Sequence, residues 1–170
     1  MKERVNNMKT LQERLEQHLQ SIRENDTIKQ ELTKILNYAK EEFRDNESQG
    51  KGEQVEKALK LLELIATEDL KAKAENRKFK PSNIRIDIKK LSPDPVVYVR
   101  EHNGFWDGGD DEDYFTCCFD YGGDGDLLGV GKKVLSKEAR HFLEDQVEKA
   151  MKIAWDRLDA MYDDSKYKNN

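Results

Sequence analysis

Apolar residues recur at steps of three and four through the first 79 residues, and this spacing most constrains the fold. It places apolar side chains along one side of an α-helix. Three series occur: Val5, Met8, Leu11, Leu15, Leu19 and Ile22; then Ile28, Leu32, Ile35, Leu36, Ala39 and Phe43; then Val55, Ala58, Leu59, Leu62, Ile65, Ala66 and Leu70. Residues 25–27 are Asn, Asp and Thr, which favour helix caps, and residues 46–52 form a polar loop with glycines. The sequence therefore predicts about three amphipathic helices within residues 1–79, the first from about residue 3 to residue 24.

The composition is lean, with 36% hydrophobic against 38% charged residues. Chains of this kind fold as helices with wide solvated faces. Because the apolar series are narrow, pairing of the N-terminal helices in a coiled-coil homodimer is an alternative to packing within one chain. We favour packing within the chain, since no series sustains three or four heptads.

The second half of the chain contains segments typical of strands. Ile84, Ile86 and Ile88 alternate with polar residues, and residues 96–100 and 114–121 are rich in β-branched and aromatic types. Residues 127–134 form a shorter, glycine-broken segment, and Ser136 is a good cap for a final helix. The expected fold class is α+β, with a small antiparallel meander of three to four strands covered by a long C-terminal helix. We expect a helical region at 1–79 and a sheet with its helix at 80–170, sharing one core.

Residues 101–126 carry an unusual concentration of charge. They hold nine carboxylates and no Lys or Arg, whereas the whole chain has a net charge of −5. Aromatic residues such as Phe105, Trp106 and Tyr114 lie in the same stretch. Charge that steers a partner, combined with aromatic anchors, is typical of a recognition surface. The candidate partner-binding residues are Trp106, Asp107, Asp110, Asp111, Glu112, Asp113, Asp124 and Asp126.

The hypothesis that follows is a non-enzymatic inhibitor or adaptor that binds a basic protein surface, such as that of a nuclease or another nucleic-acid-binding protein. Nuclease inhibitors, phage counter-defence proteins and toxin-immunity proteins share this general character, in some cases as nucleic-acid mimics, but no residue-by-residue match supports membership of such a family. The carboxylates fall in two glycine-rich turns, 107–113 and 122–126. Consecutive turns of a meander lie at opposite ends of the sheet, so the first turn alone is the safer candidate surface.

Binding of calcium or magnesium by the acidic turns is the first alternative. Counted from Asp120, an EF-hand loop would place Gly122 at position 3 and Gly131 at position 12, where oxygen ligands are required. The pattern is therefore no EF-hand, and we assign no metal ligand and no cofactor. His18, His102 and His141 are far apart in the sequence, and no nucleophile elbow, phosphate loop or zinc spacing occurs. An enzyme is not expected.

The second alternative is contact with nucleic acid through residues 77–90. Residues 71–90 hold eight cations and two carboxylates, and such clusters can neutralise phosphate charge. We favour a solvated surface instead, because the acidic stretch would repel nucleic acid. No run of apolar residues is long enough to span a membrane, and the N-terminus lacks the apolar core of a signal peptide. With adjacent Cys117 and Cys118, which suit a reducing compartment, this favours a cytoplasmic protein.

Overall fold

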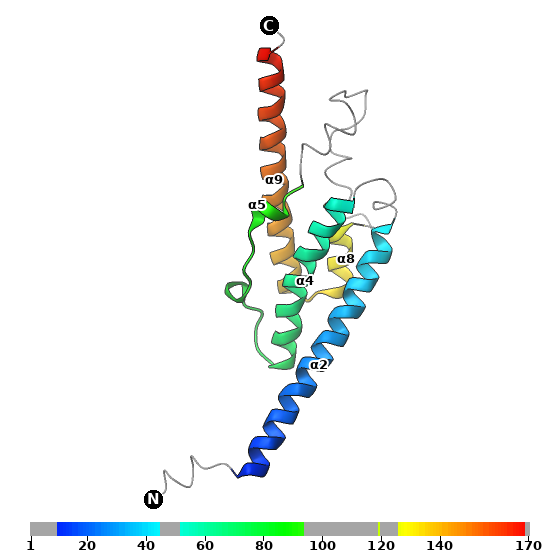
Figure 1. Cartoon of the computed structure of the whole chain (residues 1–170), viewed down its shortest axis with the longest axis vertical. Helices are drawn as coiled ribbons and strands as arrows, with labels where there is room; N and C mark the ends of the chain where they lie inside the picture. The colour runs from blue at the N-terminus through cyan, green and yellow to red at the C-terminus, as the bar shows by residue number, and fades with distance from the viewer. Residues whose placement is uncertain (1–9, 45–51, 94–118, 120–125, 169–170) are drawn as a thin grey trace, which may run out of the picture.

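A computed structural model describes residues 10–44, 52–93, 119 and 126–168, and side chains within this set up to residue 160. Its elements, in chain order, are α2 (Leu11–Glu42), α4 (Gly52–Ala74), the 3₁₀ turn η1 (Pro81–Asn83), α5 (Ile88–Leu91), α8 (Leu127–Val134) and α9 (Lys137–Lys168). Figure 1 shows α2 and α9 as the two long helices, which extend toward opposite ends of the molecule.

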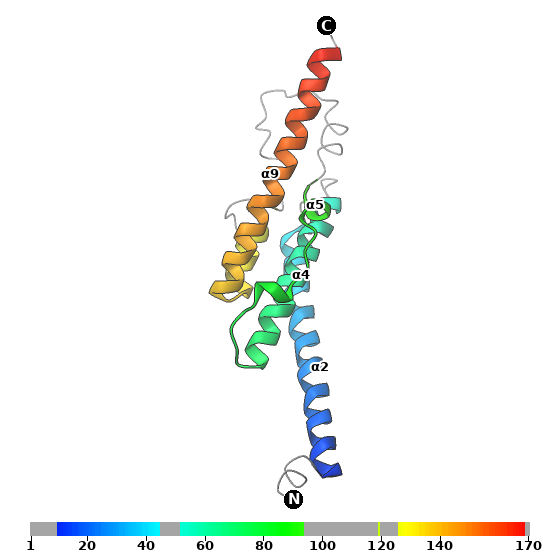
Figure 2. The same ribbon diagram turned by 90° about the vertical axis from the view of Figure 1, so that its left-hand side faces the viewer.

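Helix α4 lies at the centre of the arrangement. It packs against α2 and α9, and the short helix α8 packs against both long helices (Figures 1 and 2). The core between them is continuous. Its largest fully buried side chains are Phe43, Phe119, Leu61, Leu62, Ile65, Leu127, Leu143, Met151, Leu158, Val130 and Val147.

The predicted α+β class is wrong for the described part of the chain, which is helical and contains no strand. Residues 127–134, expected to form a strand, are the helix α8. Asp126 caps this helix, and its apolar side chains Leu127, Leu128 and Val130 are all buried. An apolar run of eight residues is too short for its period to distinguish a strand from a buried helix.

Residues 84–88 were also predicted as a strand. Ile84 and Ile86 are half-buried and Arg85 and Asp87 are exposed, so the expected alternation of burial is present. The segment pairs with no strand among the described residues, however, and Ile88 already begins α5. Here the backbone is extended while it crosses the helices, which reproduces the period of a strand without a sheet. The other two predicted strands, at 96–100 and 114–121, lie outside the described residues apart from Phe119, which is fully buried.

The first two predicted helices are one helix. Thr10 caps α2 by accepting a hydrogen bond from the Glu13 backbone amide at 3.1 Å. The helix then continues through Asn25, Asp26 and Thr27, which were expected to interrupt it. The Thr27 hydroxyl donates to the Arg23 carbonyl at 2.9 Å, the bond by which threonine is accommodated inside a helix. Within residues 1–79 the structure therefore describes two long helices rather than three.

The predictions for α4 and α9 are confirmed at the level of the elements. Helix α4 ends at Ala74 with Asn76 at φ 51°, and the Arg77 amide donates to the Ala72 carbonyl at 2.9 Å. This is a Schellman motif, in which Asn takes the left-handed position that glycine often fills. Ser136 precedes α9 as its cap, and its carbonyl accepts from the Arg140 amide at 2.8 Å. The apolar face of α9 is buried from Leu143 to Leu158.

Candidate functional site

The last described residues before the acidic stretch, Ser92 and Pro93, are buried in the helical body. The Ser92 hydroxyl donates to the Ala150 carbonyl of α9 at 2.6 Å, and Lys57 of α4 donates to the Ser92 carbonyl at 2.8 Å. Ser92 is fully buried, and Pro93 beside it is buried as well. Ser92 is therefore held between two helices, nine residues before the acidic stretch begins at Glu101.

The acidic stretch ends at Asp126, which has only 4% of its surface exposed. The Asp126 carboxylate accepts a hydrogen bond from the Gly129 amide at 2.7 Å and so caps α8. Between the two attachments, Phe119 is fully buried in the common core. The chain is thus joined to the body at Ser92, at Phe119 and at Asp126.

Of the eight candidate partner-binding residues, only Asp126 is described, and it serves as a helix cap inside the fold. The other candidates lie outside the described residues: Trp106, Asp107, Asp110, Asp111, Glu112, Asp113 and Asp124. Sequence reasoning treated Asp126 as one more carboxylate of the acidic turn. Its position directly before an apolar run, with Lys132 and Lys133 at the end of that run, was the signal for a cap.

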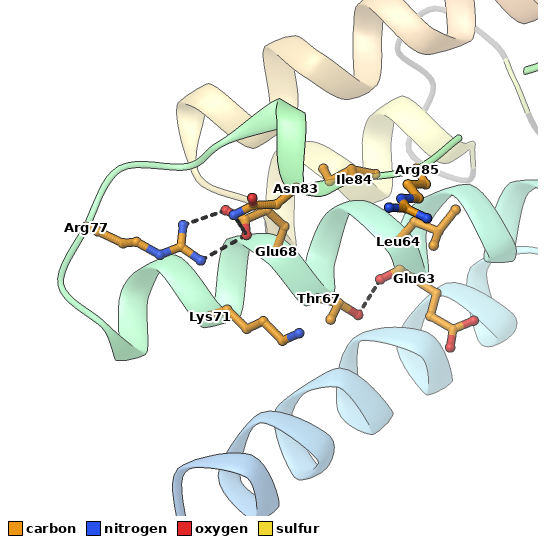
Figure 3. A pocket seen from close by; sticks show the side chains of 9 residues that line it. All are labelled: Glu63, Leu64, Thr67, Glu68, Lys71, Arg77, Asn83, Ile84 and Arg85. Atoms are coloured by element: carbon orange, nitrogen blue, oxygen red, sulfur yellow. Dashed lines mark hydrogen bonds and ion pairs between the residues drawn. The ribbon is translucent and has the colours of Figure 1, made fainter. Parts of the chain in front are cut away.

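A second polar cluster connects α4 to the basic strap, which we define as residues 75–87. The Glu68 carboxylate accepts hydrogen bonds from Arg77 Nη1 and Nη2 at 2.8 and 2.9 Å (Figure 3). It also accepts from the Lys80 amide at 2.9 Å and from Asn83 Nδ2 at 3.0 Å. Glu75 forms a further ion pair with Arg77. One buried carboxylate therefore organises the whole turn of the strap.

The hydrogen bonds from Arg77 lower the pKa of the Glu68 carboxyl from 4.5 to about 2, even though burial opposes the shift. The same contacts raise the pKa of Arg77 above its ordinary value. A carboxylate with four donors and a depressed pKa is a poor proton acceptor at neutral pH. The geometry therefore assigns Glu68 to holding the strap rather than to acid–base chemistry.

A cavity of about 550 Å³ lies between α4 and the strap (Figure 3). Its lining includes three cations, Lys71, Arg77 and Arg85, and two carboxylates, Glu63 and Glu68. Arg77 is already held by Glu68, so it is not available to a phosphate in the way that the nucleic-acid interpretation of residues 77–90 requires.

Sequence reasoning did not identify the structural carboxylates of α4. Glu68 and Asp69 follow Ile65 by three and four positions, so they interrupt the apolar face of the helix. Asp69 accepts hydrogen bonds from the backbone amide of Ser136 at 2.9 Å and from its hydroxyl at 2.6 Å. Two neighbouring carboxylates inside an apolar face were the signal, because buried acidic groups must be matched by donors.

The first two apolar series, which share helix α2, have different outcomes. From Leu32 to Phe43 the side chains of α2 pack against the core, as expected for packing within the chain. From Leu11 to Ile22 they do not, and this half of α2 extends past the end of α4 (Figures 1 and 2). The sequence shows both halves as equally amphipathic, so it could not indicate which half has a partner.

Comparisons with protein-family models, with curated proteins and with solved structures find no match for this chain. Among the described residues, no group of three or more His, Cys, Asp or Glu side chains could hold a metal ion. No helix in this part of the chain is both long and apolar enough to cross a membrane.

Proposed function

We propose that this protein is a non-enzymatic inhibitor or adaptor that presents an acidic segment to a basic protein surface. The observation that carries the proposal is the separation of charge. Residues 94–125 hold nine carboxylates and a single cation, Arg100, so their net charge is −8. Because the whole chain has a net charge of −5, the remainder, which includes the helical body, has a net charge of +3.

Such a separation favours association with a cationic partner. A concentration of one sign of charge steers an oppositely charged protein and accelerates encounter, with a strong dependence on ionic strength. The same charge disfavours binding to the phosphates of nucleic acid. A protein whose own function is to bind nucleic acid has the complementary surface, so such proteins are the partner class that we favour.

The attachments of the segment support its use as a binding element. The body holds the chain at Ser92 and again at Asp126, and Phe119 lies in the core between them. A segment joined to a rigid body at several points loses less conformational entropy on binding than a free tail does. Aromatic residues within it, notably Trp106, would supply contact area that carboxylates alone lack.

The contact surface we propose consists of Trp106, Asp107, Asp110, Asp111, Glu112, Asp113 and Asp124. Asp126 is excluded because its carboxylate caps α8. The first turn, residues 107–113, carries most of the charge and is the first target for mutation.

The test compares two triple variants that change the net charge equally. In one, Asp110, Asp111 and Asp113 are replaced by Lys. In the control, the same change is made at Glu148, Asp156 and Asp159, which are exposed on α9. Both variants and the parent are used to capture partners from an extract of the native host, and the retained proteins are identified by mass spectrometry at several salt concentrations.

We expect a basic protein to be captured by the parent and by the α9 variant, to be lost with the acidic-turn variant, and to be released by added duplex DNA. Salt should weaken the capture steeply, because the attraction is between exposed charges. Equal capture of that protein by the parent and both triple variants would refute the proposal. Loss of capture with both triple variants would also refute it, because capture would then respond to net charge alone.

We also propose a cytoplasmic location. Adjacent Cys117 and Cys118 are unsuited to an unstrained disulfide with each other, and free thiols persist in reducing compartments. Fractionation of the native host with detection of the protein in the soluble cytoplasmic fraction tests this.

A further inference from the structure

The N-terminal half of α2 carries four large aliphatic side chains in solvent. Leu11, Leu15, Leu19 and Ile22 are 84%, 55%, 42% and 43% exposed, and they lie at helical spacing. We refer to these four residues as the apolar stripe. Figures 1 and 2 both show this half of α2 projecting from the rest of the described helices.

A projecting helix of this kind is marginally stable by itself. Single helices of twelve to fifteen residues are rarely stable in water, and most helical stability in proteins comes from packing of the apolar face. Scattered apolar residues are common on surfaces, but a contiguous series on one helix face marks an interaction site. The apolar stripe therefore favours a partner that covers it.

The apolar stripe is not an extension of the face that packs on the body. At 3.6 residues per turn, its mean direction is rotated by roughly 85° from that of Leu32, Leu36, Ala39 and Phe43, which face the core. Continued beyond Ile22, the direction of the stripe meets Asp26 and Lys29, which are polar. The stripe thus ends where the body begins, and the body lies to one side of it.

The charges beside the stripe indicate what covers it. Between Leu11 and Arg23 the helix carries two carboxylates, Glu13 and Glu16, and two cations, Arg14 and Arg23, so its net charge is zero. A strongly charged partner gains nothing from such a surface. Arg14 and Glu16 lie on opposite sides of the stripe, however, and a second copy of the same helix would complement both.

We propose that two copies of this chain pair through the apolar stripe, with their α2 helices parallel and in register. Each apolar residue then meets its equivalent in the second copy, as in a short two-stranded coiled coil. The twofold axis brings Arg14 of each chain toward Glu16 of the other. In an antiparallel pair, each side of the stripe faces the same side of the second copy. Glu16 of one chain would then face Glu16 of the other.

The length of the stripe sets the strength of the pairing. From Leu11 to Ile22 it spans about three turns, fewer residues than an independently stable coiled coil requires. Pairing is therefore weak and depends on concentration, as for small, transient interfaces. The stripe shares no residue with the acidic segment, so the variant with Asp110, Asp111 and Asp113 replaced by Lys should pair as the parent does.

Sedimentation equilibrium of the full chain over a wide range of concentrations tests the proposal. The mass of the parent should rise from that of one 19.8 kDa chain toward twice that value. The variant Leu15→Gln/Leu19→Gln should remain monomeric, with its dissociation constant raised on the order of a hundredfold. Glutamine has a helix propensity close to that of leucine, so α2 itself should persist in circular dichroism.

The matched control is Gln17→Ala/Gln20→Ala, which alters the opposite side of the same helix and should leave pairing unchanged. A parent that stays monomeric at the highest concentration refutes the second copy as the occupant of the stripe. Association that is unaffected by Leu15→Gln/Leu19→Gln, or that proceeds to larger assemblies, refutes it as well.

A charge exchange tests the orientation. Glu16→Arg should raise the dissociation constant about threefold to tenfold, because each Arg14 then faces a cation, and Arg14→Glu/Glu16→Arg should restore it. An antiparallel pair predicts no rescue by the exchange. Absence of rescue would therefore overturn the parallel arrangement.

Discussion

Replacing Glu68 by Gln should destabilise this protein strongly. Glu68 is 4% exposed and accepts four hydrogen bonds, two from Arg77 and one each from the Lys80 amide and Asn83. Glutamine has the same shape but no charge, and it offers one acceptor oxygen in place of two. Arg77, whose side chain is 22% exposed, would keep only its contact with Glu75 as an ion pair.

The expected loss can be worked out in two ways. A fall in the pKa of the Glu68 carboxyl from 4.5 to about 2 corresponds to about 3 kcal/mol of folded-state stability. Removal of one partner from a buried ion pair costs about 3–5 kcal/mol, and the partial exposure of Arg77 reduces this. We therefore expect a loss of about 2–3 kcal/mol, which for a chain of this length lowers Tm by about 4–12 °C.

The assay is urea and thermal unfolding of the parent, of Glu68→Gln and of Glu75→Gln. The third protein is a matched control, since Glu75 pairs with the same Arg77 but its side chain is 55% exposed. Exposed pairs contribute little, so Glu75→Gln should cost less than about 1 kcal/mol. If the two variants lose the same free energy of unfolding, the assignment of Glu68 as the centre of the strap is wrong.

The effect should also depend on pH. Because the pKa of Glu68 is lower in the folded protein than its ordinary 4.5, the unfolded chain takes up the proton first as the pH falls. The contribution of Glu68 is thus complete above about pH 4.5 and is lost as the pH approaches 2. The difference in stability between the parent and Glu68→Gln should shrink over that window, since glutamine does not titrate. A difference that stays constant from pH 6 to about pH 2 would contradict the low pKa.

Substitutions at three further positions test the packing around α8. Asp69→Ala removes the acceptor of both Ser136 hydrogen bonds and should cost about 2 kcal/mol in urea unfolding. Asp69→Asn should have little effect on the hydrogen bond from the Ser136 backbone amide. Asp126→Ala should cost about 1 kcal/mol through loss of the α8 cap, whereas Asp126→Asn should be nearly neutral, since Asn caps equally well. Gly131→Ala would place a methyl group 2.6 Å from a Leu143 methyl in the core. We therefore expect a Tm below that of the parent, despite the better helix propensity of alanine. A higher Tm would contradict this packing.

The long helices could be predicted because their apolar residues keep one period over many turns. The cap of α9 at Ser136 follows from the residue type, because serine favours helix caps. The continuity of α2 through Asn25, Asp26 and Thr27 could not be predicted in this way. Residues that favour caps also occur inside helices when neighbouring turns hold them there, and here Thr27 bonds back to Arg23.

The class of the second half could not be predicted, because its described elements are short. Helix α8 has eight residues, and the extended segment at 84–87 is shorter still. Neither holds enough turns of an apolar pattern to distinguish a strand from a helix or from an extended connection. Composition favoured strands at both places, and tertiary packing overrode it. For the candidate site, the sequence located the concentration of charge. It could not indicate that Asp126 faces inward, which depends on where α8 begins.

Helix α4 contributes contacts on both sides of the acidic segment. Ser92, which precedes the segment, accepts a hydrogen bond from Lys57 of α4 and donates one to Ala150 of α9. Ser136, which follows α8, is held by Asp69 of α4. A substitution in α4 can therefore alter how the segment is presented without touching a partner. Loss of partner capture by Asp69→Ala therefore does not show that Asp69 contacts the partner. Loss of capture by charge reversal at Asp110, Asp111 and Asp113, with an unchanged Tm, does indicate contact. The two kinds of variant must be compared at equal stability before any residue is assigned to the binding surface.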